Sequence, residues 1–355
     1  MDELVLAREE IDEIDGQMAE LFQKRMKAVK RVALYKKANG KAVLDSAREE
    51  LVVQKNLKRL DSEEQADLYE QFIRKEMELS RAYQMRVLHE DVVAYQGAEG
   101  AFSHIALTRL YPNATQKRCE TFEGVFEAVE NGEAAFGVLP FENSFAGDVS
   151  EVLDLCFAHS LVVRAVYDLP VTHNLLAQKG AQLSDIKDVY SHAQAISQCS
   201  RFLSSMNLSF HEYANTALAA QYVAQTQDKT KGAIASLETA KLYGLEVLVK
   251  DINTSADNTT RFIVVGRTLM QSGNRFELLF TVEHRAGSLA QVVETIAEKG
   301  FNLECIKSRP MPKLAWQYYF YAELVGDAGG AAGKDLIDAL EKICKKVRLL
   351  GVYQK

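Results

Sequence analysis

The chain has 355 residues, more than a single hydrophobic core usually organises, so its length predicts two or three domains. Hydrophobic residues make up 47% of it and charged residues 26%, a composition typical of an ordinary soluble globular protein. The formal net charge of −7 argues against a nucleic-acid binder, because phosphate contacts need a basic face. A local basic pocket for a small anion is still compatible with this charge.

The cysteines and the N-terminal residues indicate the cellular compartment of the protein. The cysteines are scattered, odd in number and without metal-ligand spacing, which is typical of reduced, buried thiols. The acidic N-terminus lacks an apolar core of signal-peptide length, and no apolar run approaches membrane-spanning length. We therefore expect a cytoplasmic protein that binds neither nucleic acid nor membrane. The cysteines are Cys119, Cys156, Cys199, Cys305 and Cys344.

The first predicted element is one long helix over residues 3 to about 38, which contain no Pro and one Gly. Apolar residues recur there in a heptad-like pattern. A helix of that length extends for about 50 Å and cannot bury its own apolar stripe. The stretch Asn39-Gly40-Lys41 then ends it.

Two capping boxes predict two further helices. Ser46 with Glu49 is expected to open the second helix, and Ser62 with Gln65 the third, which would end near His89. Three helices of such unequal length predict an intertwined helical dimer rather than a closed monomeric bundle.

Polar side chains interrupt the apolar rows of these helices. Arg25 falls in an apolar row of the first helix, where an unpaired charge would cost several kcal/mol, and Lys36 lies about 20° from it around the axis. Ser80 and Gln84 lie one turn apart on the third helix, in line with apolar residues. Such a set suits an anionic, oxygen-rich ligand. The alternative is a structural ion pair between Arg25 and a helix carboxylate. The carboxylates considered for that pair are Glu49 and Glu76.

In order and spacing, this polar set resembles the active site of the all-helical chorismate mutases over about residues 1–90. That family rearranges chorismate to prephenate by a pericyclic reaction, which needs no nucleophile and no cofactor, only a folded substrate and stabilised charge. The resemblance implies that Arg8 and Arg25 hold carboxylates and that Lys36 with Gln84 contacts the ether oxygen. Glu49, Asp45 and Arg48 would orient the ring hydroxyl and its surroundings. The matching residues are Arg8, Arg25, Lys36, Asp45, Arg48, Glu49, Ser80 and Gln84.

The spacing of two arginines supports a two-chain site. Arg8 and Arg25 lie roughly 25 Å apart along one straight helix, too far to hold one small molecule together. They can meet only if Arg8 comes from a second chain, as the swapped dimer of the family implies.

From Asp91 onward, short apolar strands alternate with helices, which predicts an α/β architecture. Four of these strands lead into small polar residues at the start of a helix, a place that favours anions. Taken singly, each is more often a helix cap than a binding site. Together they predict one cleft between two lobes. The polar ends are Ser103-His104, Asn143-Ser144, Ser191-His192 and Ser236 with Glu238.

A fifth polar end precedes a buried strand in the segment Asn258-Thr259-Thr260-Arg261-Phe262. Ligands of open α/β sheets bind at strand mouths, whereas the alternative for this segment alone is a polar loop with a capped threonine. The Gly-rich turn that starts at Gly97 lacks the Lys-Ser/Thr of a phosphate loop and the spacing of a dinucleotide fingerprint.

Residues 91–267 resemble prephenate dehydratase, a two-lobed fold similar to type II periplasmic binding proteins. The family removes carbon dioxide and the ring hydroxyl from prephenate, and because the product is aromatic a positioned proton donor suffices, without metal or cofactor. The resemblance implies that Thr260 donates toward that hydroxyl and that Arg261 shapes the site, with His104 and His192 as alternative proton sources. Carboxylate and keto oxygens would bind to Asn143, Ser144, Ser191 and Gln198. The matching motifs are Gly97 through Ser103-His104, Pro140 to Ser144, Ser191-His192 with Gln198, and Thr260-Arg261-Phe262.

A short linker at 270–274 leads to a C-terminal region with βαββαβ order. Strands are expected at 276–282, about 302–309, about 316–325 and 347–352, with helices opened by Gly287-Ser288-Leu289 and over 333–346. The region resembles an ACT domain, an α+β ferredoxin-like regulatory module, and the resemblance implies L-phenylalanine as effector. Lys307 stands where relatives carry Glu, and a purely structural dimerisation domain is the alternative. The motifs expected to bind the effector are Gly287, Ser288, Leu289, Ser308, Arg309 and Pro310.

The sequence thus predicts three domains, at residues 1–90, 91–269 and 270–355, and a homodimer or tetramer acting on chorismate and then prephenate without cofactor or metal. Two alternatives are an arogenate dehydratase, which acts on the transaminated analogue, and a non-catalytic amino-acid-sensing protein. The mutase-like domain favours prephenate, because the same chain would then use its own product.

Overall fold

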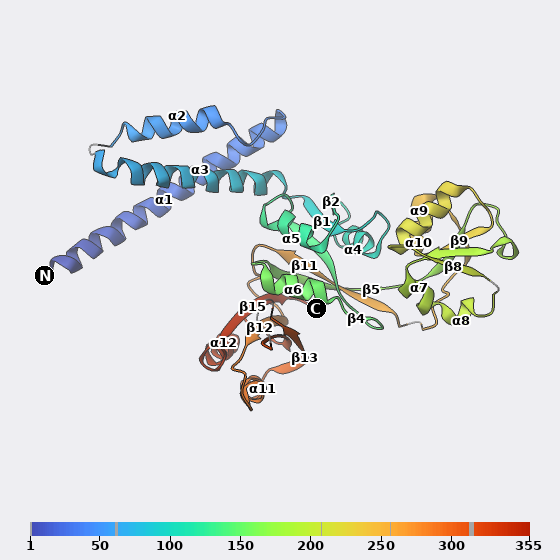
Figure 1. Ribbon diagram of the computed structural model, residues 1–355. Coiled ribbons are helices and arrows are strands. Elements are labelled where there is room, and N and C mark those ends of the chain that lie inside the picture. Colours follow the sequence, from blue (N-terminus) through green and yellow to red (C-terminus); the bar gives the residue numbers. More distant parts are fainter. Residues whose placement is uncertain (1, 61–62, 207, 256, 312–315) are drawn as a thin grey trace. The chain divides into compact units, whose positions relative to one another are not determined.

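The computed structural model describes residues 2–60, 63–206, 208–255, 257–311 and 316–355 (Figure 1). The chain divides into two compact units, Met1–Asp91 with Asn131–Ala135, and Val92–Glu130 with Phe136–Lys355. Among the helices of the described ranges, none combines the length and the apolar character needed to cross a membrane.

The first unit is built on a helix, α1 (Glu3–Ala38), that runs as one uninterrupted element and packs against α3. Its first turn is capped by Asp2, whose side chain accepts from the Leu4 amide, and it ends at Asn39 before Gly40 takes a positive φ of 61°. The other elements are α2 (Ser46–Leu57), a 3₁₀ turn (Glu63–Gln65) and α3 (Ala66–Leu88).

The helix starts differ from the predicted capping boxes. Asp45, not Ser46, caps α2, because its carboxylate accepts from the Arg48 amide at 3.0 Å and so satisfies a free donor of the first turn. Ser62 lies outside the described residues. The third helix begins at Ala66 after the 3₁₀ turn, and Gln65 makes no side-chain capping bond there.

The core of the first unit is small for its length. Its buried cluster consists of Val53, Ile73 and Met77. On α1, Ala33 alone is buried among the described residues, while Ile11 and Leu21 are 56% and 63% exposed. One chain therefore leaves most of the apolar stripe of α1 without a partner.

The second unit contains two sheets and a C-terminal domain. The chain enters the ten-stranded sheet first, crosses to the five-stranded sheet after β5, and returns along β11. The larger sheet has the order β13-β14-β12-β15-β5-β11-β3-β1-β2, with β4 paired to β3. Its first elements are β1 (Val92–Gln96), α4 (Phe102–Leu110), β2 (Thr115–Cys119), α5 (Phe122–Glu130), β3 (Phe136–Asn143), β4 (Gly147–Asp148), α6 (Ser150–Ala158), β5 (Val162–Pro170) and β11 (Thr259–Gly266).

The five-stranded sheet has the order β10-β6-β9-β7-β8 and its own core. The helices α7, α9 and α10 pack against its strands (Figure 1). Its elements are β6 (Asn174–Ala177), a 3₁₀ turn (Leu183–Asp185), β7 (Asp188–Ser191), α7 (Ala193–Gln198), α8 (Ser200–Leu203), β8 (Ser209–Glu212), α9 (Thr216–Thr226), β9 (Lys231–Ala235), α10 (Leu237–Tyr243) and β10 (Glu246–Val249).

The C-terminal domain has the predicted βαββαβ order, with antiparallel strands in the order β13-β14-β12-β15. The helices α11 and α12 share one core with alternate residues of β12, namely Phe276, Leu278 and Phe280. The last helix begins at Ala331 and ends at Ile343, earlier than expected. The elements are β12 (Arg275–Thr281), α11 (Ser288–Glu298), β13 (Asn302–Pro310), β14 (Tyr318–Val325), α12 (Ala331–Ile343) and β15 (Lys346–Tyr353).

Strand pairing joins this domain to β5 of the larger sheet. Strand β15 pairs in parallel with β5 where Gly351 lies opposite Val163. A Cβ atom on Gly351 would lie 2.7 Å from the Val163 backbone oxygen and Cβ, so only glycine allows this approach. The opposite face of the C-terminal sheet, which bears Glu277, Tyr321 and Glu323, then faces the strands β3 and β11.

Candidate active sites

The helical unit brings two of its predicted site residues, Arg25 and Ser80, together beside a carboxylate. The Arg25 Nε atom lies 3.0 Å from a Glu76 carboxylate oxygen, and its guanidinium also donates to the Ser80 hydroxyl. The ion pair considered as the structural alternative therefore exists, with Glu76 as the partner, and it coexists with the predicted neighbour Ser80. Ser80 is itself buried and donates to the Glu76 carbonyl at 2.8 Å.

A second ion pair orients Glu49. Its carboxylate lies 2.5 Å from Arg81 Nη1, and both side chains are largely covered, with 25% and 32% of their surface exposed. Sequence reasoning missed Arg81. The signal was its position one turn after Met77, which packs in the core cluster with Val53 of α2.

The remaining mutase residues are arranged as follows. Gln84 is buried, and its Oε1 atom has no hydrogen-bond partner in the described structure. Lys36 donates to the Val43 carbonyl at 2.5 Å. Asp45 and Arg48 lie at the exposed start of α2, where Asp45 acts as the helix cap.

A groove of about 460 Å³ lies beside Arg25 and Glu76. Its other lining residues are Met18, Ala19, Leu21, Phe22, Phe72, Lys75 and Leu79. Arg8 does not line it, and along the straight α1 helix Arg8 lies roughly 25 Å from Arg25. A single chain thus supplies Arg25 and Glu76 to this groove but not Arg8.

In the second unit, Asn143 connects the ends of β3 and β11. Its Nδ2 atom donates to Thr260 Oγ1 and to Asn258 Oδ1, each at 2.9 Å. Its Oδ1 atom accepts from the amides of Phe145 and Ala146. Its Nδ2 atom also donates to the Thr259 carbonyl, so both ends of this buried amide are satisfied and five partners fix its orientation.

Thr260 lies directly opposite Asn143 in the β11–β3 register. Its hydroxyl oxygen accepts the Asn143 bond, and a hydroxyl has one proton left to donate. Thr260 also lines a cavity of about 220 Å³. The geometry thus leaves one O–H donor facing a space that a small molecule can enter.

Gln198 and His173 contribute two more polar atoms to this space. The Gln198 Oε1 atom accepts from Asn258 Nδ2 at 3.0 Å and lies 2.9 Å from His173 Nε2. Burial lowers the pKa of His173, so the neutral ring donates through Nε2 to this oxygen. Gln198 Nε2 and His173 Nδ1 then have no partner in the described structure. Gln198 Nε2 is then a free donor and His173 Nδ1 a free acceptor, and both residues line the cavity.

His173 was missed by sequence reasoning. It follows the end of β5 at the crossing between the two sheets, and sequence offers only the weak signal of a lone histidine after Pro170. Its ring meets Phe102 edge-on with centroids 5.9 Å apart, and both residues line the cavity.

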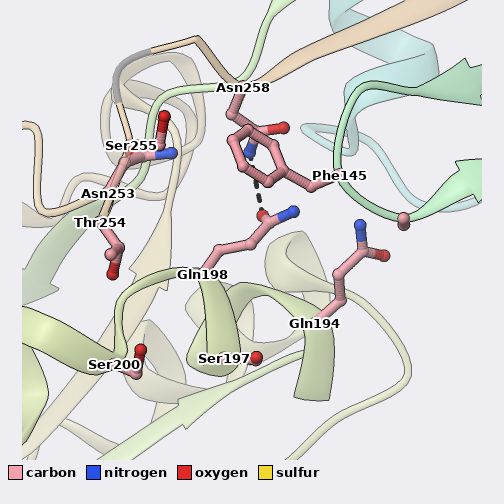
Figure 2. A pocket seen from close by; sticks show the side chains of 10 residues that line it. Phe145, Gln194, Ser197, Gln198, Ser200, Asn253, Thr254, Ser255 and Asn258 are labelled. Carbon is pink, nitrogen blue, oxygen red and sulfur yellow. Dashed lines mark hydrogen bonds between the residues drawn. The ribbon is translucent and has the colours of Figure 1, made fainter.

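A second cavity of about 380 Å³ lies beside the first and shares Gln194 and Gln198 with it (Figure 2). Figure 2 shows Gln198 on α7 and Asn258 pointing toward each other, with Phe145 next to them. None of the described residues that line the two cavities is Lys, Arg, Asp or Glu. Anions are favoured here by amide and hydroxyl donors and by the start of the eleven-residue helix α9, whose cap Asn215 and first residue Thr216 line the smaller cavity.

Several predicted residues of the dehydratase region lie elsewhere. Ser191 is fully buried and donates to the Ile234 carbonyl at 2.7 Å, and Ser103 is buried at the start of α4. Ser144 bonds to the Asp257 carbonyl and accepts from the Thr259 amide. None of these three lines either cavity.

The two histidines named as alternative proton sources differ in position. His192 lines the smaller cavity and caps α7 by accepting from the Gln194 amide. His104 accepts from the Gly100 amide and bonds to Gln116, outside both cavities. Geometry therefore keeps His192 near the site and removes His104 from it.

Arg261, which was expected to shape the site, and Phe262, the last residue of the same motif, line neither cavity. Phe262 is 1% exposed in the hydrophobic core of the larger sheet. Arg261 Nε donates to Asp168 at 3.1 Å and its Nη1 to Glu323 at 3.2 Å. Neighbouring residues of a strand project to opposite faces of the sheet. Because Thr260 lines the cavity, Arg261 lies on the face of β11 that is turned away from the cavity.

Charge stabilises Arg261 in that position. Burial opposes its charged form, but the hydrogen bond to Asp168 and the charges of Glu323 and Glu142 outweigh burial and raise its pKa. The side chain thus remains a cation on the face of β11 that meets the C-terminal domain.

A cavity of about 530 Å³ in the C-terminal domain is lined by Ser288 and Leu289. The preceding Gly287 has a φ of 86°, a conformation that other residues seldom adopt, and Ser288 Oγ is buried without a described partner. Ser308, Arg309 and Pro310 do not line this cavity. Arg309 instead makes two hydrogen bonds to Asp154 on α6, at 2.6 and 3.0 Å. The two predicted effector motifs therefore do not meet in one cavity of a single chain.

Comparisons with known proteins agree with these features. A family model described as chorismate mutase type II matches residues 7–85, and one described as prephenate dehydratase matches residues 93–269. A bifunctional chorismate mutase/prephenate dehydratase of Buchnera aphidicola is 30% identical, covering 99% of this chain and 96% of its own length. Arogenate dehydratase 2 of Petunia hybrida is 34% identical over 74% of this chain and 71% of its own.

A solved structure adds a match in three dimensions. The structure described as prephenate dehydratase in complex with L-Phe, from Arthrobacter aurescens, has a TM-score of 0.69 and 28% identity. It covers 74% of this chain and 90% of that one.

Proposed function

The chain belongs to the bifunctional chorismate mutase/prephenate dehydratases of phenylalanine biosynthesis, and we propose which of its residues carry the two reactions. The enzyme rearranges chorismate to prephenate and converts prephenate to phenylpyruvate. The observation that carries the dehydratase assignment is the Asn143–Thr260 hydrogen bond, which leaves the threonine O–H free at a cavity.

In the mutase reaction, Arg25 of one chain and Arg8 of a second hold the two carboxylates of chorismate. Lys36 and Gln84 stabilise the ether oxygen as its bond to carbon breaks, because negative charge grows there in the transition state. Arg81 fixes Glu49 through their ion pair, and Glu49 in turn orients the ring hydroxyl with Asp45 and Arg48. Ser80 and Glu76 hold Arg25 in place when no substrate is bound.

This mutase site requires an intertwined dimer of the helical unit. The exposed apolar residues of α1, among them Ile11, Ile14 and Leu21, supply a stripe that a second α1 helix can cover. The partner chain would also bring its Arg8 to the groove beside Arg25. The Arg8 side chain of the same α1 helix is too far from the groove to reach it.

In the dehydratase reaction, Thr260 donates its proton toward the departing ring hydroxyl of prephenate. The bond from the ring to its carboxyl carbon breaks, its electrons complete the aromatic ring, and carbon dioxide and water leave. The Gln198 amide donates to a carboxylate or keto oxygen through its Nε2 atom, which lacks a partner, and Asn143 sets the orientation of Thr260. The neutral His173 ring, which donates through Nε2 to Gln198 Oε1, fixes the orientation of that amide. His192 is placed to return the proton to Thr260.

Predicted residues outside the cavity support the site from behind. Ser191 ties β7 to β9, and Ser144 ties the loop after β3 to β11. We therefore assign them to positioning, together with Ser103. The two sheets and the double crossing between them suit the two lobes of a periplasmic-binding-protein-like fold that closes on its ligand.

The C-terminal region is proposed as an ACT domain that binds L-phenylalanine. Support comes from its βαββαβ order, the free Ser288 hydroxyl and the Arthrobacter structure described as a complex with L-Phe. Because its two motifs do not share a cavity within one chain, the ligand site would form between the domains of two chains in a dimer or tetramer. The domain boundaries proposed are 1–90, 91–269 and 270–355.

Arogenate is the second candidate substrate of the dehydratase, favoured by the 34% identity to the Petunia enzyme. Its amino group would add a cation, and the described cavity linings offer no carboxylate to pair with it. Prephenate, whose keto group accepts hydrogen bonds, fits the donors better.

The decisive experiment incubates the purified protein with chorismate and follows prephenate and then phenylpyruvate by chromatography. We expect both to form in that order. Chorismate consumption without phenylpyruvate would contradict the dehydratase assignment, and arogenate turnover faster than prephenate turnover would favour the second candidate.

A further inference from the structure

The strands that carry Asn143 and Thr260 present charged residues on their other face. Asn143 lies opposite Thr260, and the next pair in the β11–β3 register is Arg261 opposite Glu142. The first pair faces the cavity, and the second pair faces the C-terminal domain. Each proposed dehydratase residue thus has a direct chain neighbour in contact with the other domain.

On the β11 side, the contact is made by Glu323. Its carboxylate is 3% exposed and lies 3.2 Å from Arg261 Nη1. It also accepts a hydrogen bond from the Tyr353 hydroxyl at 2.7 Å. Glu323 is central in β14, so its position is set by the hydrogen-bond ladders of the C-terminal sheet.

On the β3 side, the contact is made by Lys307. Its ammonium lies 3.1 Å from Glu142, also pairs with Asp148, and lies 5.1 Å from the centre of the Phe141 ring. Only 10% of the side chain is exposed. Strand β13 therefore holds the end of β3 and the adjoining strand β4 by one buried cation.

These contacts form one line of alternating charge. The order is Asp148, Lys307, Glu142, Arg261 and Glu323, with the Glu142 and Arg261 groups 4.0 Å apart. A third cross-domain pair, Arg309 with Asp154, lies outside this line and connects to helix α6. The structure thus offers two pairs behind the dehydratase residues and one similar pair elsewhere.

We propose that Glu323 and Lys307 of the C-terminal domain are positioning residues of the dehydratase reaction, acting through Arg261 and Glu142 on Thr260 and Asn143. The proposal rests on the dehydratase assignment made above. Its physical basis is that a strand is stiff, so a side chain fixed behind it limits where the neighbouring residue can point. Displacements of about 1 Å at a catalytic group can lower a rate by two orders of magnitude.

The test compares variants of the full-length protein with prephenate as substrate. Glu323→Gln keeps the volume of the side chain and removes its charge. Lys307→Gln removes the charge of the second contact with a shorter polar side chain. We expect each to lower kcat by at least about fivefold while KM changes less than about twofold, because the cavity residues that bind substrate remain. Lys307→Arg keeps the cation and should retain most of the activity.

The matched control is Asp154→Asn, which weakens the third cross-domain pair. It should leave the dehydratase kcat within about twofold of wild type. The chorismate mutase rate, measured on every variant, reports whether the rest of the chain is intact.

Three results overturn the proposal: unchanged kcat in Glu323→Gln and Lys307→Gln, an equal loss in Asp154→Asn, or a loss expressed mainly in KM. If one variant does not fold, the other variant and the comparison with Lys307→Arg still test the proposal. Absence of dehydratase activity in the wild-type protein would instead contradict the assigned function.

Discussion

Asn143 Nδ2 and Thr260 Oγ1 lie 2.9 Å apart across two neighbouring antiparallel strands, and this bond determines which way the threonine hydroxyl can donate. The oxygen is already an acceptor for the amide, so the hydroxyl proton remains available to another partner, and Thr260 lines the cavity. The pair therefore gives a weak acid a fixed direction, which is what departure of a hydroxyl group requires.

The first prediction concerns this hydroxyl. Thr260→Val keeps the shape of the side chain and removes the donor, and it should lower the dehydratase rate by at least about 100-fold, since a positioned proton donor contributes that much. Thr260→Ser keeps the hydroxyl and should retain measurable activity. The mutase rate of both variants should stay at the wild-type level, and an unchanged dehydratase rate in Thr260→Val would remove Thr260 from its proposed role.

A second prediction concerns the mutase cation. Arg25→Ala should abolish chorismate consumption and leave Glu76 without its ionic partner, while conversion of added prephenate continues. Coupled and separate assays on the same sample measure both steps. Loss of both activities would show that the two sites are not independent.

The third prediction tests the two-chain mutase site. Arg8→Ala and Arg25→Ala chains are each expected to be inactive alone. Co-expression should restore about a quarter of the wild-type mutase rate, because half of the dimers are mixed and one of their two sites has both arginines. If the co-expressed chains are as inactive as each variant alone, Arg8 and Arg25 act within one chain.

Glu277 provides a prediction on pH. Burial, with the charge of Glu323 opposite it, raises the pKa of Glu277 to about 7, although a hydrogen bond with Tyr321 opposes the shift. Arg261 and Tyr353 are the other titratable groups that act on it. The folded state thus binds a proton more tightly than the unfolded state, so stability is greatest at low pH and falls as pH rises from about 4.5 to 7.

The magnitude can be measured by comparing thermal midpoints of wild type and Glu277→Gln at pH 5 and pH 8. We expect the free energy of unfolding of the wild type to fall by up to about 3 kcal/mol between pH 5 and pH 8. Glu277→Gln should abolish this fall, so the variant should be relatively more stable at pH 8. Glu304→Gln, which removes an exposed partner of Arg275, is the control and should keep the wild-type pH dependence. Parallel curves for wild type and Glu277→Gln would contradict the raised pKa.

The last prediction concerns the effector. L-Phe at 100 times its dissociation constant should stabilise the folded protein by about 2.7 kcal/mol and lower the dehydratase rate. Ser288→Ala should weaken both effects, because the Ser288 hydroxyl is a buried group with no described partner. If L-Phe moves neither the thermal midpoint nor the rate, the regulatory assignment fails for that ligand.

Local patterns in the sequence were enough for most of the helices and strands. The long first helix, the break at Gly40 and the βαββαβ order of the last domain follow from apolar periodicity and turn residues, which act between near neighbours. Thr260 was predicted at a strand mouth for the same reason, since an apolar run after a polar segment indicates where the strand begins.

Partners distant in the chain could be decided only by the tertiary structure. Sequence could not tell that Arg261 turns away from Thr260 to meet Glu323, that Lys307 meets Glu142, or that His173 joins Gln198. Each of these depends on strand register and on which faces pack together, and these are settled by burial across the whole sheet rather than by neighbouring residues. The sequence by itself therefore determined the family and the order of elements, and the packing of the sheets decided which of the polar residues face the cavity.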